Sequence, residues 1–337
     1  MKEFHNARLR DILTYKRPHD GPTEREFVEK FLGDKKYAEN MTNYHDAAYV
    51  YEIKLSDGTD AKTMFSCHMD TVHRSDGKQK IKYDRQTKCY YKTDNEPLGA
   101  DDGAGMWIML EMMDAGVPGT YVFHRGEERG GIGSGWLADN MQPWLKSFNR
   151  AIAFDRRGST DVITYQGGSR CCSDAFAQAL ADGLNASNDC MMYIPDDSGV
   201  FTDTANYTDT IPECTNISCG YNNEHTGRET LHLPTVFALR DACLKMDWEF
   251  LPTKRDPKVR DNLWSNYGWP SAKSKHVYDL PIDKSIYHMT KDEMLDMVYA
   301  EPELFVDLLR EELYGEYDVQ ADEEFNDASW PIAVRYS

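Results

Sequence analysis

The sequence lacks long hydrophobic runs and positive charge. No stretch approaches the roughly 20 apolar residues that span a bilayer, and residues 1–21 carry charges throughout where a signal peptide needs an apolar core. Only 38 Lys and Arg residues stand against 57 Asp and Glu residues, a formal net charge of −19. A field of that sign repels nucleic acid and anionic lipid. We therefore expect no nucleic-acid partner, no membrane partner and a cytoplasmic location.

Paired cysteines and nucleotide-binding motifs are missing too. None of the eight cysteines belongs to a C-x-x-C pair, and several lie inside apolar runs, so we predict reduced thiols and no disulfides. The sequence has no P-loop, and GADDGAG (residues 99–105) has no third glycine in the register of a dinucleotide fingerprint. These absences weaken the hypothesis of a mononuclear metal or phosphate-binding enzyme built on the glycine-rich turns.

What the 337 residues do contain is an alternation of apolar strands and helices. The hydrophobic patterns predict strands at 47–55, 63–70, 120–124, 150–155, 190–195 and 213–220. They predict helices at 24–32, from the glycine-rich turn to Gly116, and at 134–141, 173–184 and 233–246, the first opened by a capping box at Thr23 and Glu26. Such alternation is typical of an α/β fold with a mostly parallel central sheet and helices on both faces.

The character of the sequence changes after this alternating part. We predict a catalytic domain at 1–249 and a C-terminal extension at 250–337, which comprises an irregular loop to 289, two short helices and an acidic tail from 314. Three aromatic residues of the loop, Trp264, Tyr267 and Trp269, could form a subunit contact of a homo-oligomer, a lid over a pocket or ordinary packing.

Potential metal ligands follow four of the predicted strands. A lone carboxylate at a strand end is usually a turn or capping residue, but here several cases coincide, and ligands of open parallel sheets bind beyond the carboxyl ends of strands. A further carboxylate lies in the glycine-rich turn. These residues are His68 and Asp70, Glu127 and Glu128, Asp155, His225 and, from the turn, Asp101. Two histidines with three of these carboxylates suit zinc, with cobalt or manganese as alternatives, and a bridging carboxylate can hold two ions.

In order and spacing, the motifs resemble those of the di-zinc exopeptidases of clan MH, which include aminopeptidases, carboxypeptidases, peptidase T and related deacylases. The resemblance is carried by HMDTV (68–72), GADDGAG (99–105), GEERGGIGS (126–134), FDRRG (154–158) and NISCGYNNEHTGRE (216–229). One departure is Gly103, which stands where many relatives carry Lys or Arg.

The resemblance implies two zinc ions per chain and a role for each residue. Asp101 would bridge the ions, His68 and Asp155 would complete one site, and Glu128 and His225 the other. Glu127 would act as general base, and Asp70 is placed to hold the second ring nitrogen of His68. The segment 195–207 resembles the loop that lines the substrate pocket in relatives, with Thr202 and Asp203 as candidates.

Chain length distinguishes the subfamilies. From Asp155 to His225 the chain runs only 70 residues (225 − 155), too few for the inserted lid domain of carboxypeptidase-type relatives. The sequence therefore predicts a single catalytic domain of the aminopeptidase type and a hydrolase that cleaves a peptide or amide bond, most simply an exopeptidase. Two alternatives stay open: an N-acyl amino acid deacylase on the same scaffold, and a catalytically silent binding or structural protein.

Overall fold

The computed structural model describes residues 6–188, 190–259 and 261. The chain divides into two units, 1–270 and 271–337, and every described residue belongs to the first. The predictions made for residues 262–337, including the two helices, the acidic tail and the three aromatic residues, lie outside the described residues. The division at 249 and 250 stays a prediction.

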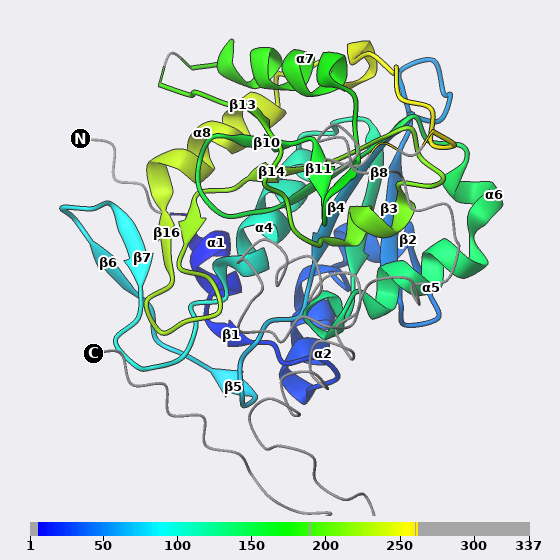
Figure 1. Cartoon of the computed structure of the whole chain (residues 1–337). Helices are drawn as coiled ribbons and strands as arrows, with labels where there is room; N and C mark the ends of the chain where they lie inside the picture. The colour runs from blue at the N-terminus through cyan, green and yellow to red at the C-terminus, as the bar shows by residue number, and fades with distance from the viewer. Residues whose placement is uncertain (1–5, 189, 260, 262–337) are drawn as a thin grey trace, which may run out of the picture. The chain divides into compact units, whose positions relative to one another are not determined.

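An eight-stranded sheet forms the centre of this unit, in the order β13-β10-β14-β9-β4-β8-β3-β2 (Figure 1). Its strands are β2 (Met41–Tyr44), β3 (Ala48–Ile53), β4 (Thr63–His68), β8 (Gly119–His124), β9 (Arg150–Arg156), β10 (Asp161–Ile163), β13 (Ile194–Asp196) and β14 (Glu213–Ser218). The four central strands β14, β9, β4 and β8 are parallel to one another, whereas β2, β3 and β10 introduce antiparallel pairs. The predicted mostly parallel sheet is confirmed.

Helices cover both faces of the sheet, as predicted. Helix α4 (Ala100–Asp114) packs on β4 and β9, and α1 (Ala7–Ile12) and α8 (Leu233–Cys243) pack on α4. Helix α5 (Ile132–Asn140) packs on β3, and α6 (Gln142–Leu145) packs on α5 (Figure 1). The other helices are α2 (Pro22–Phe31), α3 (Lys35–Ala38), α7 (Asp174–Asn185) and the 3-10 helices η1 (Glu127–Arg129), η2 (Asp203–Tyr207) and η3 (Trp248–Phe250).

The central strands are buried along their whole length. Every residue of β4, β8 and β14 is buried, which explains why β4 and β8 have mostly apolar residues without strict alternation. In the register of β4 and β8, His68 lies opposite His124, so both strands end at the same edge of the sheet. Residues that follow these strands are therefore brought together there.

Shorter strands form three small sheets at the periphery. Strand β1 (Tyr15–Lys16) pairs with β5 (Gly77–Lys78), and β11 (Tyr165–Gln166) with β12 (Ser169–Arg170). A four-stranded sheet joins β15 (Tyr221–Asn222), β16 (Thr230–His232), β7 (Cys89–Tyr91) and β6 (Lys82–Asp84). Apart from β15, which joins the four-stranded sheet, the elements between Asp155 and His225 belong to the central sheet, to β11–β12 or to the helices that pack with them, so the described chain has no inserted lid domain there.

The predicted capping box of α2 is wrong. The helix begins at Pro22, one residue before the predicted cap, and Thr23 lies inside it. The Thr23 backbone N–H donates to Asp76 Oδ1 at 2.9 Å, while its Oγ1 accepts from the Gly77 N–H at 2.6 Å. A carboxylate 53 residues further along the chain therefore serves the start of this helix.

The strand predicted at 190–195 is much shorter in the structure. Only Ile194–Asp196 forms β13. Just before it, the Asn185 side chain accepts from the Tyr193 N–H at 2.7 Å and donates to the Tyr193 carbonyl at 2.9 Å. These two bonds hold the backbone before β13 against the end of α7. In a longer strand, the backbone there would pair with a neighbouring strand instead.

Arg150 binds the segment that follows α8 to the start of β9. The buried guanidinium donates to the carbonyls of Trp248 and Leu251 at 2.9 and 2.8 Å. Trp248 also packs edge-on against Phe65 of β4, with ring centroids 4.9 Å apart. The residues after 247 are thus part of the packing at the amino ends of the central strands, opposite the edge that carries the predicted ligands.

None of the helices in the described part of the chain is long and apolar enough to cross a bilayer. All eight cysteines lie among the described residues, and all are free thiols; only Cys190 is exposed.

A buried histidine is expected to make the fold sensitive to acid. His73 bonds to Thr71 Oγ1 at 2.7 Å and to Gln79 Oε1 at 2.9 Å, and burial together with the charge of Arg17 lowers its pKa to about 4. Because an unfolded histidine titrates near about 6.5, the stability that depends on neutral His73 is present above that pH and is lost as the pH falls towards 4. Urea unfolding should show this loss.

The variant His73→Gln should show a shallower decrease of unfolding free energy between pH 6.5 and 4 than the parent chain. The exposed His45, replaced in the same way, serves as the matched control. Equal slopes for the parent and His73→Gln would contradict the prediction.

Candidate active site

The predicted ligands of the first ion meet at the carboxyl ends of β4 and β9. His68 is the last residue of β4, Asp155 lies near the end of β9, and Asp101 lies in the first turn of α4. His68 Nε2 is 3.0 Å from Asp101 Oδ1 and 3.5 Å from Asp155 Oδ1. The three side chains are at least nine-tenths buried.

The predicted ligands of the second ion meet on the other side of Asp101. His225, in the loop between β15 and β16, places Nε2 3.1 Å from Asp101 Oδ2 and 3.0 Å from Glu128 Oε1. Asp101 therefore turns one carboxylate oxygen towards each histidine. His225 has a φ of +62°, which is uncommon for a residue with a Cβ. The loop holds this backbone geometry where the ring reaches the carboxylates.

These donor atoms fit a pair of metal ions. Tetrahedral zinc with bonds of about 2.0–2.1 Å places its ligand atoms roughly 3.3 Å apart, and the four separations above range from 3.0 to 3.5 Å. Glu128 Oε1 is buried and makes no well-directed hydrogen bond with any described residue. A shared carboxylate with a histidine on each side is the donor set expected for two neighbouring zinc ions. The assignment of each ligand to its ion stays a prediction.

Glu127 lies beside both groups of ligands with its carboxylate uncommitted. None of the described residues forms a hydrogen bond or ion pair with its side chain. It lines a small cavity of about 100 Å³ together with Asp101 and Asp155. Burial and the neighbouring carboxylates raise the pKa of Glu127 to about 10, whereas bound cations would favour its charged form. Its position suits a base that faces substrate and water.

Asp70 orients both the histidine before it and the turn of the two glutamates. Its carboxylate accepts hydrogen bonds from the backbone N–H groups of Gly126, Glu127 and Glu128 at 2.9, 3.1 and 3.3 Å. His68 Nδ1 is 3.0 Å from the backbone carbonyl of Asp70 and 3.6 Å from its carboxylate. Because Nδ1 of His68 faces the Asp70 carbonyl, Nε2 is directed towards the predicted ions. The Asp70 carboxylate holds the turn that carries the two glutamates.

Glycines give that turn its shape. Gly126, Gly130 and Gly131 have φ values of +74°, +86° and +67°, a region that residues with a Cβ rarely adopt. They flank η1 on both sides, so the chain reverses sharply between β8 and α5. The reversal places Glu127 and Glu128 at the ends of the central strands.

Sequence analysis missed Glu229, which holds the glycine-rich turn. Its buried carboxylate accepts four backbone hydrogen bonds of 2.7–3.0 Å, from Leu98, Gly99, Ala100 and Asp101. Burial raises its pKa to about 7. Glu229 lies four residues after His225 in the same quoted motif, so one short segment supplies a predicted ligand and orients another. The only sequence signal was a charged residue directly before the short strand β16.

Sequence analysis also missed the buried Arg17. Its guanidinium donates to the carbonyls of Met69 and Gly99 at 2.6 and 3.1 Å and lies 4.7 Å from the centre of the Phe27 ring. A Cβ at Gly103 would lie 3.5 Å from Nη2 of this arginine. The departure from the family pattern at Gly103 therefore coincides with a positive charge that comes from the N-terminal segment.

The predicted substrate residues of the loop before η2 point into the protein. Thr202 donates to Asp155 Oδ2 at 2.6 Å, and Asp203 lies 3.3 Å from Nδ1 of the buried His124. Their neighbours Val200 and Phe201 line the cavity at the site instead. The loop therefore lines the cavity through Val200 and Phe201, while Thr202 contacts the predicted ligand Asp155 behind it.

Residues 49–232, which include every predicted ligand, match the sequence pattern of peptidase family M28. The chain belongs to peptidase family M28. It is accordingly a metallopeptidase by family, and the resemblance to the clan MH exopeptidases is confirmed. A direct search of curated protein sequences finds no significant match to this M28 chain.

Solved structures of aminopeptidases share the fold of this M28 chain. A tripeptidase from Staphylococcus aureus superposes with a TM-score of 0.55 at 14% identity, over 70% of this chain and 95% of the other. Aminopeptidase PepT from Bacillus cereus gives 0.52 at 14% identity, over 70% and 95%. An aminopeptidase from the archaeon Desulfurococcus kamchatkensis gives 0.52 at 13% identity, over 74% and 94%.

Proposed function

We propose that this M28 chain is a two-zinc exopeptidase that removes the N-terminal residue of peptides in the cytoplasm. The observation that carries the proposal is the arrangement of His68 and His225 on either side of Asp101, with the uncommitted Glu127 beside them. The arrangement supports hydrolysis more strongly than a silent binding role, because ligands and base are all present.

Each residue of the site has a separate role in amide hydrolysis. Zinc ions held by the five ligands would polarise the scissile carbonyl and lower the pKa of water. Glu127 accepts the proton of the attacking water and passes it to the leaving amine. Asp70 keeps Glu127 in place through the backbone of the turn, and Thr202 and Tyr221 donate to Asp155 at 2.6 and 3.1 Å to orient it.

The charges of the site favour a free amino terminus. Arg156 pairs with Asp161 and Arg157 with Glu224, both at 3.0 Å, so the basic side chains nearby already have acidic partners. Glu127 has no cationic partner among the described residues. The two zinc ions would balance the charge of the ligand carboxylates, so the preference comes from the cavity: neither of its arginines is free for a substrate carboxylate, and Glu127 remains for an ammonium group. Apolar contact for a substrate side chain comes from Ile163, Val200 and Phe201.

The proposed location is supported by the cysteines. Eight free thiols, seven of them wholly or partly buried, are typical of proteins from a reducing compartment.

Metal removal tests the proposal directly. We expect about two zinc ions per chain by elemental mass spectrometry, and cleavage of aminoacyl 4-nitroanilides that chelation abolishes and zinc restores. The same sample is assayed on N-acyl amino acids, which separates the deacylase alternative. Cleavage of the N-acyl substrates alone would replace the aminopeptidase proposal. No tight metal and no cleavage after zinc, cobalt or manganese is added back would overturn it in favour of a silent binding protein.

A further inference from the structure

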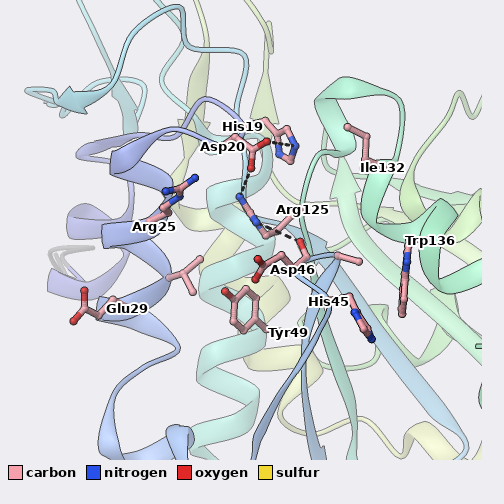
Figure 2. Close-up of a pocket in the computed structure, with 12 residues that line it drawn as sticks. His19, Asp20, Arg25, Glu29, His45, Asp46, Tyr49, Arg125, Ile132 and Trp136 are labelled. Atoms are coloured by element: carbon pink, nitrogen blue, oxygen red, sulfur yellow. Dashed lines mark hydrogen bonds and ion pairs between the residues drawn. The ribbon is translucent and has the colours of Figure 1, made fainter. Parts of the chain in front are cut away.

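A second cavity, whose lining residues Figure 2 shows, lies beside Gly126 at the start of the Glu127 turn. It measures about 720 Å³, several times the volume of the cavity at the predicted ligands. Its walls come from the segment that leads into α2, from α2 itself, from the β2–β3 turn and from α5. The residues that matter here are His19, Arg25, Tyr49, Arg125, Ile132 and Trp136.

The cavity is close to the proposed catalytic position. Arg125 in its wall precedes Gly126 and Glu127 directly, so its Cα is at most about 7 Å from that of Glu127. A Cβ at Gly126 would lie only 3.0 Å from the His19 ring, which shows that the cavity wall packs on the turn itself. An extended peptide advances about 3.4 Å per residue. Two or three substrate residues beyond the scissile bond therefore span about 7–10 Å, the scale of the separation between Glu127 and the cavity wall at Arg125.

One arginine of the cavity is neutralised within the protein. Arg125 donates to both carboxylate oxygens of Glu24, at 3.2 and 2.8 Å, and to Asp20 at 2.8 Å. These carboxylates raise the pKa of Arg125 further above its ordinary value. The group of His19, Asp20 and Glu24 has the donor types of a metal site, but the guanidinium occupies both carboxylates and explains the cluster without an ion.

The other arginine is free. No carboxylate of the described residues lies within 4.0 Å of the exposed Arg25 guanidinium, although the protein as a whole carries a net charge of −19. Asp46, which also lines the cavity, accepts from the Asn43 amide at 2.9 Å. Figure 2 shows the Glu29 carboxylate directed away from Arg25. Arg25 is therefore available to an anionic group that enters the cavity.

The wall opposite Arg25 is aromatic and apolar (Figure 2). The His45 and Trp136 rings contact each other with centroids 4.9 Å apart and planes tilted by 36°, and Ile132 leaves 52% of its surface exposed beside them. An aromatic surface of this kind offers a large contact area at little conformational cost. It can receive an apolar side chain that lies next to an anionic group on Arg25.

We propose that this cavity binds the carboxylate-bearing end of a short peptide substrate, with Arg25 pairing with the carboxylate and Trp136 and Ile132 contacting the neighbouring side chain. The inference rests on the proposed aminopeptidase function and adds the substrate class. The acidic site takes the ammonium end, and Arg25 takes a carboxylate two or three residues away. Together they fit a di- or tripeptide with both termini free.

Three tripeptides test the proposal. Leu-Gly-Phe carries the terminal carboxylate, Leu-Gly-Phe amide lacks it, and Leu-Gly-Glu amide carries a carboxylate on the side chain only. We expect kcat/KM to favour the free acid over its amide by about tenfold, the worth of one hydrogen-bonded charge pair. Arg25→Gln should reduce this ratio to near 1, and Arg25→Lys should keep part of it. Arg85→Gln, an exposed arginine in the turn between β6 and β7, is the matched control and should leave the ratio unchanged.

The outcomes separate this inference from the proposed function. If kcat/KM for Leu-Gly-Glu amide equals that for the free acid Leu-Gly-Phe, Arg25 also binds a side-chain carboxylate. If it equals that for Leu-Gly-Phe amide, Arg25 binds only the terminal carboxylate. A ratio that Arg25→Gln leaves unchanged overturns the inference while the aminopeptidase function stands. If no peptide is cleaved, the proposed function fails. Calorimetry with Gly-Phe and its amide then tests whether the cavity binds a carboxylate. Tighter binding of the acid that depends on Arg25 supports the site, and equal binding overturns it.

Discussion

Replacing Glu127 by glutamine is expected to lower kcat by about a hundred- to ten-thousand-fold, the range for loss of a general base. The amide has the same shape but accepts no proton. Asp70 holds the turn through backbone N–H groups of Gly126, Glu127 and Glu128, so the substitution leaves the fold of the turn intact. The measurement is steady-state cleavage of an aminoacyl 4-nitroanilide together with the zinc content of the same sample.

Glu128→Gln is the matched comparison for this variant. It changes the adjacent residue in the same way, but at a predicted ligand that lies 3.0 Å from His225. We expect Glu128→Gln to lower the zinc content and Glu127→Gln to leave it unchanged. A Glu127→Gln protein with full activity would contradict the role of Glu127 as the base. A Glu127→Gln protein that loses zinc while Glu128→Gln keeps it would reverse the roles assigned to the two residues.

The second large effect is expected for Glu229→Gln. The four backbone N–H groups that now point at a carboxylate would meet an amide, whose nitrogen repels two of them. Leaving buried donors unpaired costs about 1–3 kcal/mol each, and misplacing the support of a metal ligand typically costs about 10–100-fold in affinity. We therefore expect a stability loss of about 3 kcal/mol and a zinc affinity about tenfold to a hundredfold lower, measured by urea unfolding and by competition with a chelator.

Glu213 provides a control that separates stability from metal binding. It is equally buried and accepts from the backbone N–H groups of Ser173, Lys254 and Arg255 at 2.6–3.0 Å, at the opposite edge of the sheet. Glu213→Gln should destabilise the protein by a similar amount and leave the zinc affinity unchanged. If both variants weaken zinc binding equally, the effect of Glu229 is general destabilisation and not the positioning of Asp101.

The fold was largely predictable because its signals are local. Central strands such as β4 and β8 are mostly apolar and buried along their whole length, and the helices between them begin and end at glycine-rich or polar turns. The predicted ligands were visible for the same reason, since each follows a strand or opens a helix. The partners of those ligands were not visible, because they are brought in by the fold. Glu229 binds backbone groups 128 or more residues away, and Asp76 serves the start of α2 from 53 residues away.

The substrate loop shows a second limit of sequence reasoning. Successive residues of an extended segment point to opposite sides, so a loop can be recognised while the side that faces the site is misjudged. Thr202 is extended, with φ −154° and ψ 167°, and turns towards Asp155, whereas Phe201 before it faces the cavity. Which set faces inward depends on how the fold fixes the loop, through the bridge of Gly199 to Gln166 and the hydrogen bond of Thr202 to Asp155, and one sequence does not contain that information.

The hydrogen bonds of Arg150 set a lower limit on the length of an active fragment. A recombinant chain that ends at residue 249 would lose the Leu251 carbonyl and leave part of a buried guanidinium without an acceptor, at a cost of about 1–3 kcal/mol. It would also remove Lys254 and Arg255, whose N–H groups bond to the buried Glu213. Fragments designed for crystallisation should therefore extend at least to residue 261, because Asp261 also pairs with Arg170 at 2.7 Å.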